Sequence, residues 1–256
     1  MIILSNSELN KIIKIIFDFI FPRICLSCNT KLNLDESVIC NSCKNTIKIV
    51  PQEFLKLEYL KKFHNDLIID DFESCFLFEK EKVLQKVLHS YKYENKIYVG
   101  KFLGDLIYSN LEKFIKLWDA DLIIPVPLHS LKKAERGYNQ SYYIAKQVAK
   151  RLEIPIDKKL LKRRRYTQSQ TKMNLIERKE NVKNAFMLKD KKKIFGKKII
   201  LVDDVITTGA TIGECAKILK ENGAIKIFAL SVAIPIDHIL FGAETPNIDS
   251  PFLNTI

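Results

Sequence analysis

Glycine and proline are scarce in this sequence, with eight of each among 256 residues, which argues against long flexible or proline-rich linkers. Cysteine, at six residues, is too sparse for a small secreted scaffold held by disulfides, so we expect a reducing, cytoplasmic setting. No internal repeat is visible, and no apolar run is long enough to span a membrane. The hydrophobic content of 47% predicts one sizeable core with a small satellite module.

Acidic residues are outnumbered, since 30 Asp and Glu face 42 Lys and Arg, and the net charge is +12. A basic surface suits phosphorylated metabolites, nucleic acid or an anionic membrane face, although a lysine-rich composition without any partner explains the charge alone equally well. Position favours an anionic partner, because the basic residues gather in runs that flank the motif described below. These runs are 158–159, 162–165, 191–193 and 197–198.

Residues 1–24 are predicted to form an amphipathic helix. Its apolar face comprises Ile12, Ile15, Ile16, Phe19 and Ile20. Charged residues interrupt the apolar run and Pro22 closes it, a pattern that fits neither a signal peptide nor a membrane span. We expect the helix to pack on its own domain. The alternative is a peripheral anchor at the inner face of the membrane.

Four of the six cysteines form two C-x-x-C pairs, Cys25 with Cys28 and Cys40 with Cys43. Two such pairs within nineteen residues predict a closed tetrahedral zinc site, structural rather than catalytic, in a module spanning residues 25–50. We expect a hairpin around residues 33–37 between the pairs. Two redox pairs or an iron–sulfur cluster are the competing interpretations. Cys75 and Cys215 stand alone in apolar surroundings and are predicted to be buried thiols.

Residues 70–235 are predicted to form an α/β domain, preceded by a connector of uncertain structure at 44–70. Apolar runs predict buried strands, and helical periodicity predicts helices between them. The strands are expected at 72–78, 121–126, 199–202 and 225–233, with a short one at 185–188, and the helices at 83–89, 98–115, 142–152 and 210–222. Such alternation indicates a Rossmann-like parallel sheet. In the helix at 98–115 we expect Leu103, Ile107, Leu111 and Phe114 to face inward. We read 127–136 and 163–181 as loops, and 236–256 as an irregular tail.

The most informative segment runs from residue 199 to residue 211, with the sequence IILVDDVITTGAT. A strand buried on both faces ends in two carboxylates, Asp203 and Asp204, at the sheet edge where open α/β folds bind ligands. A small hydroxyl-rich turn follows, comprising Thr207, Thr208, Gly209, Ala210 and Thr211, and a helix begins near Ala210. Its amino-terminal N–H groups and dipole favour an anion. The segment therefore predicts a phosphate site with carboxylates that accept hydrogen bonds from sugar hydroxyls.

This segment resembles the phosphoribosyl-pyrophosphate fingerprint of type I phosphoribosyltransferases. The resemblance implies that Asp203 and Asp204 hold the ribose hydroxyls, and that the loop from Thr207 to Thr211 holds the 5-phosphate. It also implies that Mg²⁺ accompanies the ligand. The segment is not a P-loop, because no glycine-rich run ending in G-K-[ST] is present.

Further motifs resemble the ComF family of competence-associated proteins. They are Pro125-Val126-Pro127, then Arg136-Gly137-Tyr138-Asn139-Gln140-Ser141, then Gln170, Arg178 and Asn181-Val182, with the paired cysteines ahead of them. The resemblance implies a part in natural transformation, with single-stranded DNA and other competence proteins as candidate partners. It also implies that Arg136, and Arg178 in the second loop, bind pyrophosphate, as a bidentate guanidinium can. Asp204 is the candidate catalytic carboxylate.

Two functions stay open at this point. In the first, the protein transfers phosphoribose to an acceptor for which the sequence offers no recognisable site. In the second, it handles single-stranded DNA, and the phosphoribosyl-pyrophosphate loop is regulatory or vestigial. For the segment from His89 to Tyr93 we slightly favour an amphipathic surface over a place in the ligand cleft.

Overall fold

The structure is a computed structural model that describes residues 18–64, 68–165 and 182–236. Most of the helix predicted at 1–24, most of the loop predicted at 163–181 and the tail beyond 236 lie outside these residues. Gln170 and Arg178 lie outside them too. Among the described helices, none has both the length and the apolar character needed to cross a bilayer.

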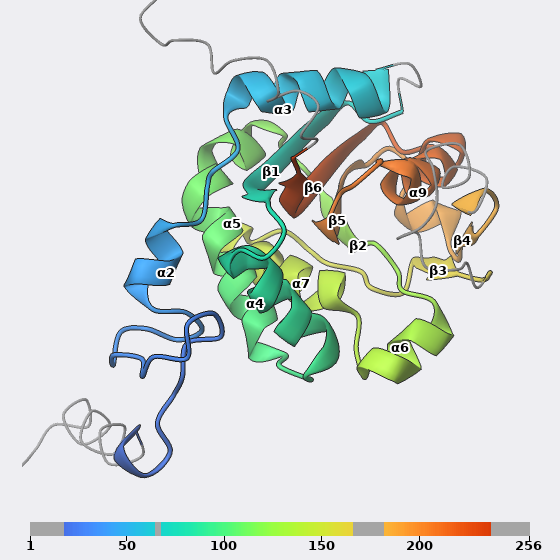
Figure 1. Ribbon diagram of the computed structural model, residues 1–256. Helices are drawn as coiled ribbons and strands as arrows, with labels where there is room; N and C mark the ends of the chain where they lie inside the picture. The colour runs from blue at the N-terminus through green and yellow to red at the C-terminus, as the bar shows by residue number, and fades with distance from the viewer. Residues whose placement is uncertain (1–17, 65–67, 166–181, 237–256) are drawn as a thin grey trace, which may run out of the picture.

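A four-stranded parallel sheet forms the centre of the molecule, in the order β1-β6-β5-β2 (Figure 1). The strands are β1 (Asp71–Phe78), β2 (Leu122–Pro125), β5 (Lys198–Val205) and β6 (Lys226–Pro235). The two central strands, β5 and β6, are buried along most of their length because helices cover both faces. Each strand lies within a few residues of its predicted position, and β5 extends through the two aspartates.

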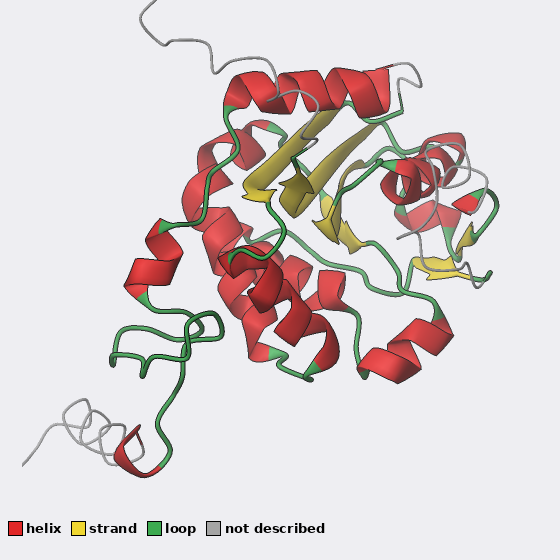
Figure 2. Cartoon of the chain, viewed as in Figure 1, coloured by secondary structure: helices red, strands yellow, loops and turns green. Residues whose placement is uncertain are grey.

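Helices on opposite faces of the sheet make two separate apolar clusters (Figure 2). One face is covered by α4 (Val83–Tyr93), α5 (Tyr98–Leu117) and α7 (Gln140–Leu152). The other is covered by α3 (Gln52–Tyr59) and α9 (Ala210–Glu221). In α5 the inward residues Leu103, Ile107 and Leu111 are buried as predicted, but Phe114 is 41% exposed and Ile115 takes the inward position.

The connector at 44–70 is largely helical and packs on the sheet. After the short α2 (Asn41–Asn45), α3 leads into a π-helical turn, η1 (Leu60–His64). Phe54, Leu55 and Phe63 are buried in the same apolar cluster as α9. Sequence periodicity missed this element because it is short and because Leu57 and Leu60, which are apolar but exposed, blur the apolar face.

The structure has elements on both sides of α7 that the sequence did not predict, and β3 overlaps the loop predicted at 163–181 only at Arg163. Residues 127–136 were predicted to be a loop but contain α6 (Ser130–Arg136), which the His129 side chain caps by accepting from the Leu131 N–H. After α7, β3 (Leu161–Arg163) pairs antiparallel with β4 (Phe186–Leu188), and a 3-10 turn, η3 (Lys191–Lys193), precedes β5. The predicted strand at 185–188 is therefore confirmed in a separate small sheet.

Candidate ligand site at the carboxyl edge of the sheet

The two aspartates lie at the end of β5 and are fixed by short hydrogen bonds. Asp203 Oδ1 accepts from Ser141 Oγ at 2.8 Å and from its neighbour's backbone N–H at 2.9 Å. Asp204 Oδ1 accepts from the Val205 N–H at 2.8 Å. Ser141 lies in the first turn of α7, so the start of that helix is tied directly to the edge of the sheet. The predicted pair is thus held rigidly where open α/β sheets bind ligands.

The two carboxyl groups have different electrostatic surroundings. Burial raises the pKa of Asp203 to about 7, and the charge of Asp204 beside it adds to the shift. Burial opposes ionisation of Asp204 as well, but Lys92, the Val205 N–H and Arg136 together outweigh it and leave the pKa of Asp204 below its usual value. The pair therefore combines one stably ionised carboxylate with one that gains a proton more readily.

Lys92 was not predicted to belong to the site, yet its Nζ lies 2.5 Å from Asp204 Oδ2. The preference for an amphipathic surface at His89–Tyr93 was wrong for Lys92 and also for Tyr91, which is fully buried. The prediction of a surface position is correct for His89 and Tyr93, which are exposed and whose rings contact each other. No local sequence signal distinguishes Lys92 from other helix-end lysines, because its partner belongs to a distant strand.

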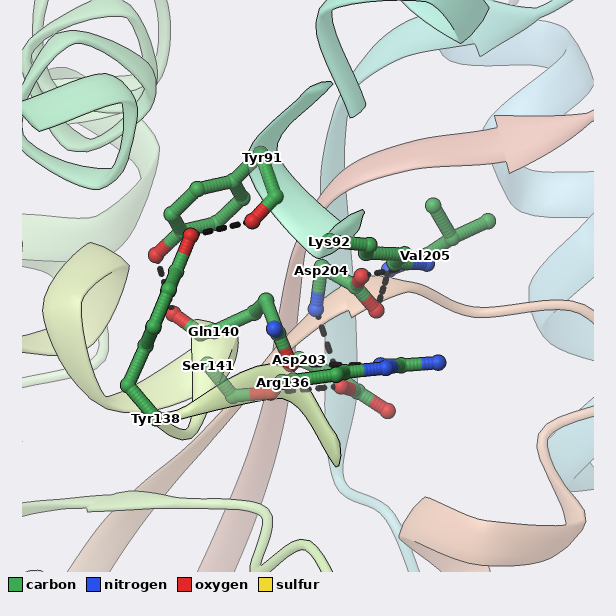
Figure 3. A network of polar contacts seen from close by, with 9 residues as sticks. All are labelled: Tyr91, Lys92, Arg136, Tyr138, Gln140, Ser141, Asp203, Asp204 and Val205. Atoms are coloured by element: carbon green, nitrogen blue, oxygen red, sulfur yellow. Dashed lines mark hydrogen bonds and ion pairs between the residues drawn. The ribbon is translucent and has the colours of Figure 1, made fainter. Parts of the chain in front are cut away.

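Two buried tyrosines brace the end of α4 against the start of α7 (Figure 3). Tyr91 Oη donates to the Gln140 carbonyl at 2.7 Å, and Tyr138 Oη donates to the Tyr91 carbonyl. Gly100 lies directly beneath, and a Cβ there would come within 2.3 Å of Tyr91 Oη. These contacts hold Tyr91, and with it the backbone that leads into Lys92, against α7, whose Ser141 binds the acid pair of Asp203 and Asp204.

Arg136, which the sequence predicts to bind pyrophosphate, is the last residue of α6. Its Nη1 donates to Gln140 Oε1 at 3.2 Å, and its guanidinium lies over the Tyr93 ring, 5.4 Å from the centroid. It is close enough to help lower the pKa of Asp204. Gly137 follows with φ of 76°, a left-handed conformation that ends α6 and turns the chain toward α7.

Two further basic side chains, Lys132 and Arg163, interact electrostatically with this group of side chains. The pKa of Lys132 is lowered by burial and then by the positive charges of Arg163 and Arg136. Arg163, in β3, is close enough to Asp203 for the two to interact electrostatically. The structure thus brings together cations from α4, α6 and β3 around the aspartates.

The predicted phosphate loop, residues 207–211, connects β5 to α9. Gly209 adopts φ of 77° and caps the helix, and the Ala210 N–H donates to Thr208 Oγ1 at 3.3 Å. The left-handed conformation strains any residue with a side chain. Thr207 is exposed, Thr208 and Thr211 are partly exposed, and Gly209 is buried against the connector. The loop therefore places three threonines that are at least partly exposed at the amino terminus of a twelve-residue helix.

The four predicted cysteine ligands converge on one point. Their Sγ atoms all lie within 4.8 Å of one another, and Cys28 Sγ is 3.6 Å from Cys40 Sγ. A tetrahedron of thiolates around zinc requires sulfur separations of about 3.8 Å, since the Zn–S bond is about 2.3 Å. The Cys40 N–H also donates to Cys25 Sγ at 3.4 Å. The residues present therefore fit one structural zinc ion.

The segment between the cysteine pairs is a turn and not the predicted hairpin. The Glu36 carboxylate organises it by accepting from the N–H groups of Asn33 and Asn41, both at 2.7 Å. Lys86 Nζ, on α4, donates to the Ser27 carbonyl at 3.1 Å. The four-cysteine module consequently packs on the helix that carries Lys92. Its apolar residues share a cluster with α4 and α5, and they are Cys25, Leu32, Val38, Ile39 and Cys43.

Sequence comparisons agree with this organisation. A phosphoribosyl transferase domain matches residues 139–237. The chain is 28% identical over 213 residues to competence protein F of Haemophilus influenzae, covering 79% of this chain and 93% of that protein. It is 30% identical over 214 residues to competence protein ComFC of Streptococcus pneumoniae, covering 78% and 90%. A shorter alignment, 31% identical over 144 residues, covers 55% of this chain and 63% of the DNA utilization protein YhgH of Escherichia coli.

Solved structures overlap with the chain more weakly. The purine phosphoribosyltransferase from Pyrococcus horikoshii gives a TM-score of 0.35 at 19% identity, covering 52% of this chain and 74% of that one. The fold follows from the parallel sheet, its strand order and the matched domain. The chain has a type I phosphoribosyltransferase fold preceded by a four-cysteine module, and it belongs to the ComF family of competence-associated proteins.

Proposed function

We propose that this protein binds 5-phosphoribosyl-1-pyrophosphate with Mg²⁺ and acts in natural competence. The observation that carries the proposal is the arrangement at the end of β5. There the aspartates fixed by Ser141 and Val205 are followed by the turn at Gly209 and the amino terminus of α9. The names of the relatives, competence proteins and a DNA utilization protein, support the biological setting.

The 5-phosphate would sit at the loop of residues 207–211, where the dipole of α9 and the threonine hydroxyls favour an anion. The ribose 2- and 3-hydroxyls would donate to Asp203 and Asp204, as the resemblance to type I transferases implies. An ionised carboxylate accepts stronger hydrogen bonds than a protonated one, so the ligand should bind best when both aspartates are ionised. The pKa of Asp203, raised to about 7, makes this ligand affinity sensitive to pH near neutrality.

The pyrophosphate would lie toward Arg136, whose guanidinium can bind two phosphate oxygens at once. Arg178, outside the described residues, is proposed to reach the same group. Carboxylate and phosphate oxygens are the hard ligands that Mg²⁺ prefers, so the acid pair suits a magnesium ion carried in by the ligand. When bound, the ion would neutralise charge on the departing pyrophosphate.

In the catalytic form of this proposal, the bond from ribose C1 to pyrophosphate breaks and an acceptor atom bonds to C1. The electron pair of the broken bond leaves with pyrophosphate. Asp204, kept ionised beside Lys92, is the carboxylate proposed to stabilise the positive ribose. The acceptor is unassigned, and an acceptor screen for released pyrophosphate tests this step.

The alternative is a protein that handles single-stranded DNA, and one surface favours it. Exposed basic side chains gather on and around β3, β4 and η3, and the ion pair between Lys193 and Asp157, at 3.3 Å, joins two of their runs. Neutralising DNA phosphates with such side chains releases counterions, so binding should weaken steeply with salt. We call these residues the basic cluster: Lys158, Lys159, Lys162, Arg164, Arg165, Lys189, Lys191, Lys192 and Lys193.

Calorimetric titration of phosphoribosyl pyrophosphate with Mg²⁺ tests the main proposal. The wild-type protein should bind, and the double variant Asp203→Asn/Asp204→Asn should not. Glu53→Gln, an exposed carboxylate on α3, is the matched control and should bind as wild type does. A folded wild-type protein that does not bind would leave DNA handling as the stronger proposal.

A further inference from the structure

More positive charges surround Asp203 and Asp204 than these two carboxylates can neutralise. Lys92 forms an ion pair with Asp204, while Lys132, Arg136 and Arg163 lie near enough to affect one another. With both aspartates ionised, four cations still outnumber three anions, since Glu135 also interacts with Lys132. In the ligand-free protein these cations repel each other, and the repulsion contributes to the lowered pKa of Lys132. An anion with several charges would relieve it.

Gln140 supplies an independent indication of a ligand. The residue is 2% exposed, and Arg136 Nη1 donates to its Oε1, which leaves Nε2 as the free donor of the amide. Nε2 has no hydrogen-bond partner among the described residues. A buried polar donor without a partner costs free energy, so it indicates a group that is bound at another stage.

Lys92 is held in place by more than its ion pair with Asp204, because buried hydrogen bonds fix the neighbouring backbone. The preceding residue, Tyr91, is held twice, because its hydroxyl donates to the Gln140 carbonyl and its own carbonyl accepts from the Tyr138 hydroxyl. The Lys92 side chain is only 23% exposed. Figure 3 shows Lys92, Arg136, Gln140 and Ser141 gathered around the two aspartates. This arrangement brings the end of α4, far along the chain from β5, into the ligand site.

We propose that Lys92 and Gln140 bind the pyrophosphate group of the ligand together with Arg136. Lys92 contacts Asp204 when the site is empty and shares its ammonium with a phosphate oxygen when the ligand enters. Gln140 Nε2 then donates to the same group. This inference rests on the proposed function and adds to it two ligand-binding residues, of which Lys92 lies outside the matched domain of residues 139–237.

A simpler role for Lys92 would be to hold Asp204 ionised and in place. If that were its role, replacing Lys92 would lower the affinity equally for every ligand that binds the aspartates. If Lys92 contacts pyrophosphate directly, the replacement lowers the affinity only for ligands that carry a pyrophosphate group. Ribose 5-phosphate distinguishes the two, because it keeps the hydroxyls and the 5-phosphate but lacks the pyrophosphate.

The test is calorimetric titration of wild type and Lys92→Met with three probes, each with Mg²⁺. The probes are phosphoribosyl pyrophosphate, inorganic pyrophosphate and ribose 5-phosphate. Lys92→Met should weaken binding of the first two by about tenfold or more, as expected when a charge-assisted hydrogen bond is removed. Ribose 5-phosphate should change by less than about threefold. Lys101→Met, an exposed lysine on α5, is the control and should match wild type.

Thermal unfolding of each variant accompanies the titrations. If Lys92→Met is not folded, Lys92→Gln carries the same comparison, because it keeps a donor toward Asp204 without the charge. Unchanged affinity for phosphoribosyl pyrophosphate, or an equal loss for ribose 5-phosphate, would overturn the inference while the proposed function stands. A wild-type protein that binds none of the probes would overturn both.

Discussion

Gly209 packs directly against Phe63, and a Cβ added to the glycine would come within 2.6 Å of Phe63 Cε1. The packing joins the phosphate loop to η1, part of a connector to which the sequence assigned no structure. Phe63 is itself buried and makes an edge contact with Phe72 of β1, with ring centroids 5.5 Å apart. The shape of the loop thus depends on an element far away in the sequence.

Replacing Gly209 with alanine should therefore impair both stability and ligand binding. The left-handed φ of 77° is expected to cost about 1–3 kcal/mol for a residue with a side chain, and the clash with Phe63 adds to that cost. Gly196 is the control, since its φ is 71° but a Cβ there meets nothing within 4 Å. The melting temperature should fall further in Gly209→Ala than in Gly196→Ala when thermal unfolding is measured. Equal drops would mean that Phe63 exerts no constraint.

Asp203 should make stability depend on pH in a predictable direction. Its pKa in the folded protein, about 7, lies above that of an unfolded aspartate, so the fold favours the protonated form. The stability linked to that proton is fully present below the unfolded pKa and is lost as pH rises through about 7. We therefore compare the melting temperature of Asp203→Asn with that of wild type at each pH. The difference, variant minus wild type, should be higher at pH 8 than at pH 4 by about 2 °C or more. A difference that does not change with pH would contradict the assigned shift.

The four-cysteine module should bind one zinc ion, and losing it should destabilise the protein. The metal fixes a segment too small to fold alone, and that segment packs on α4. Metal analysis should find one zinc in wild type and none in Cys28→Ser/Cys40→Ser, whose melting temperature should fall. Cys75→Ala is the control, because Cys75 is buried away from the cluster and should leave zinc content unchanged. Visible absorption from bound iron, or zinc lost in the control, would refute the assignment.

The basic cluster should determine the salt dependence of any DNA binding. Replacing Lys191, Lys192 and Lys193 with serine should weaken binding of single-stranded DNA. It should also flatten the plot of log affinity against log salt concentration, by about 0.7 for each phosphate that the variant no longer neutralises. A matched triple variant replaces three lysines that are exposed on α5 and α7, namely Lys101, Lys146 and Lys150. Similar losses in both triple variants would indicate a general effect of charge rather than a binding surface.

Local sequence patterns were sufficient to predict the elements on which the site is built. Four apolar residues from Ile199, two acids and a small-residue turn predicted β5, the sheet edge and the start of α9, and the structure has all three. Two C-x-x-C pairs predicted a cysteine cluster, and the four sulfur atoms converge. In these segments, residues that are close together in the sequence are enough to predict the structure.

The parts that local patterns missed depend on contacts between distant segments. Lys92 looks like any lysine at a helix end until the buried Tyr91 and Tyr138 place it beside Asp204. The short α6 was taken as a loop because its seven residues bury no side chain and so carry no apolar stripe.

The assignment of Phe114 failed for a related reason. It was expected inward because it follows Leu111 by three residues, which is a helical spacing, yet the neighbouring Ile115 is the residue buried in the apolar cluster. Positions three and four residues along a helix lie on the same face. The surface against which the helix packs determines which of the two residues is buried, and the local sequence holds no information about that surface.

A structure of the protein with phosphoribosyl pyrophosphate and Mg²⁺ would be the most direct test. We expect the 5-phosphate at residues 207–211, the ribose hydroxyls on Asp203 and Asp204, and the pyrophosphate within hydrogen-bond reach of Lys92 and Arg136. A cavity of about 300 Å³ adjoins this loop, and its lining includes Thr208, Gly209 and Ala210 together with Lys62 and Lys217. Ligand bound on the basic cluster, or bound in that cavity without contact to the two aspartates, would contradict this expectation.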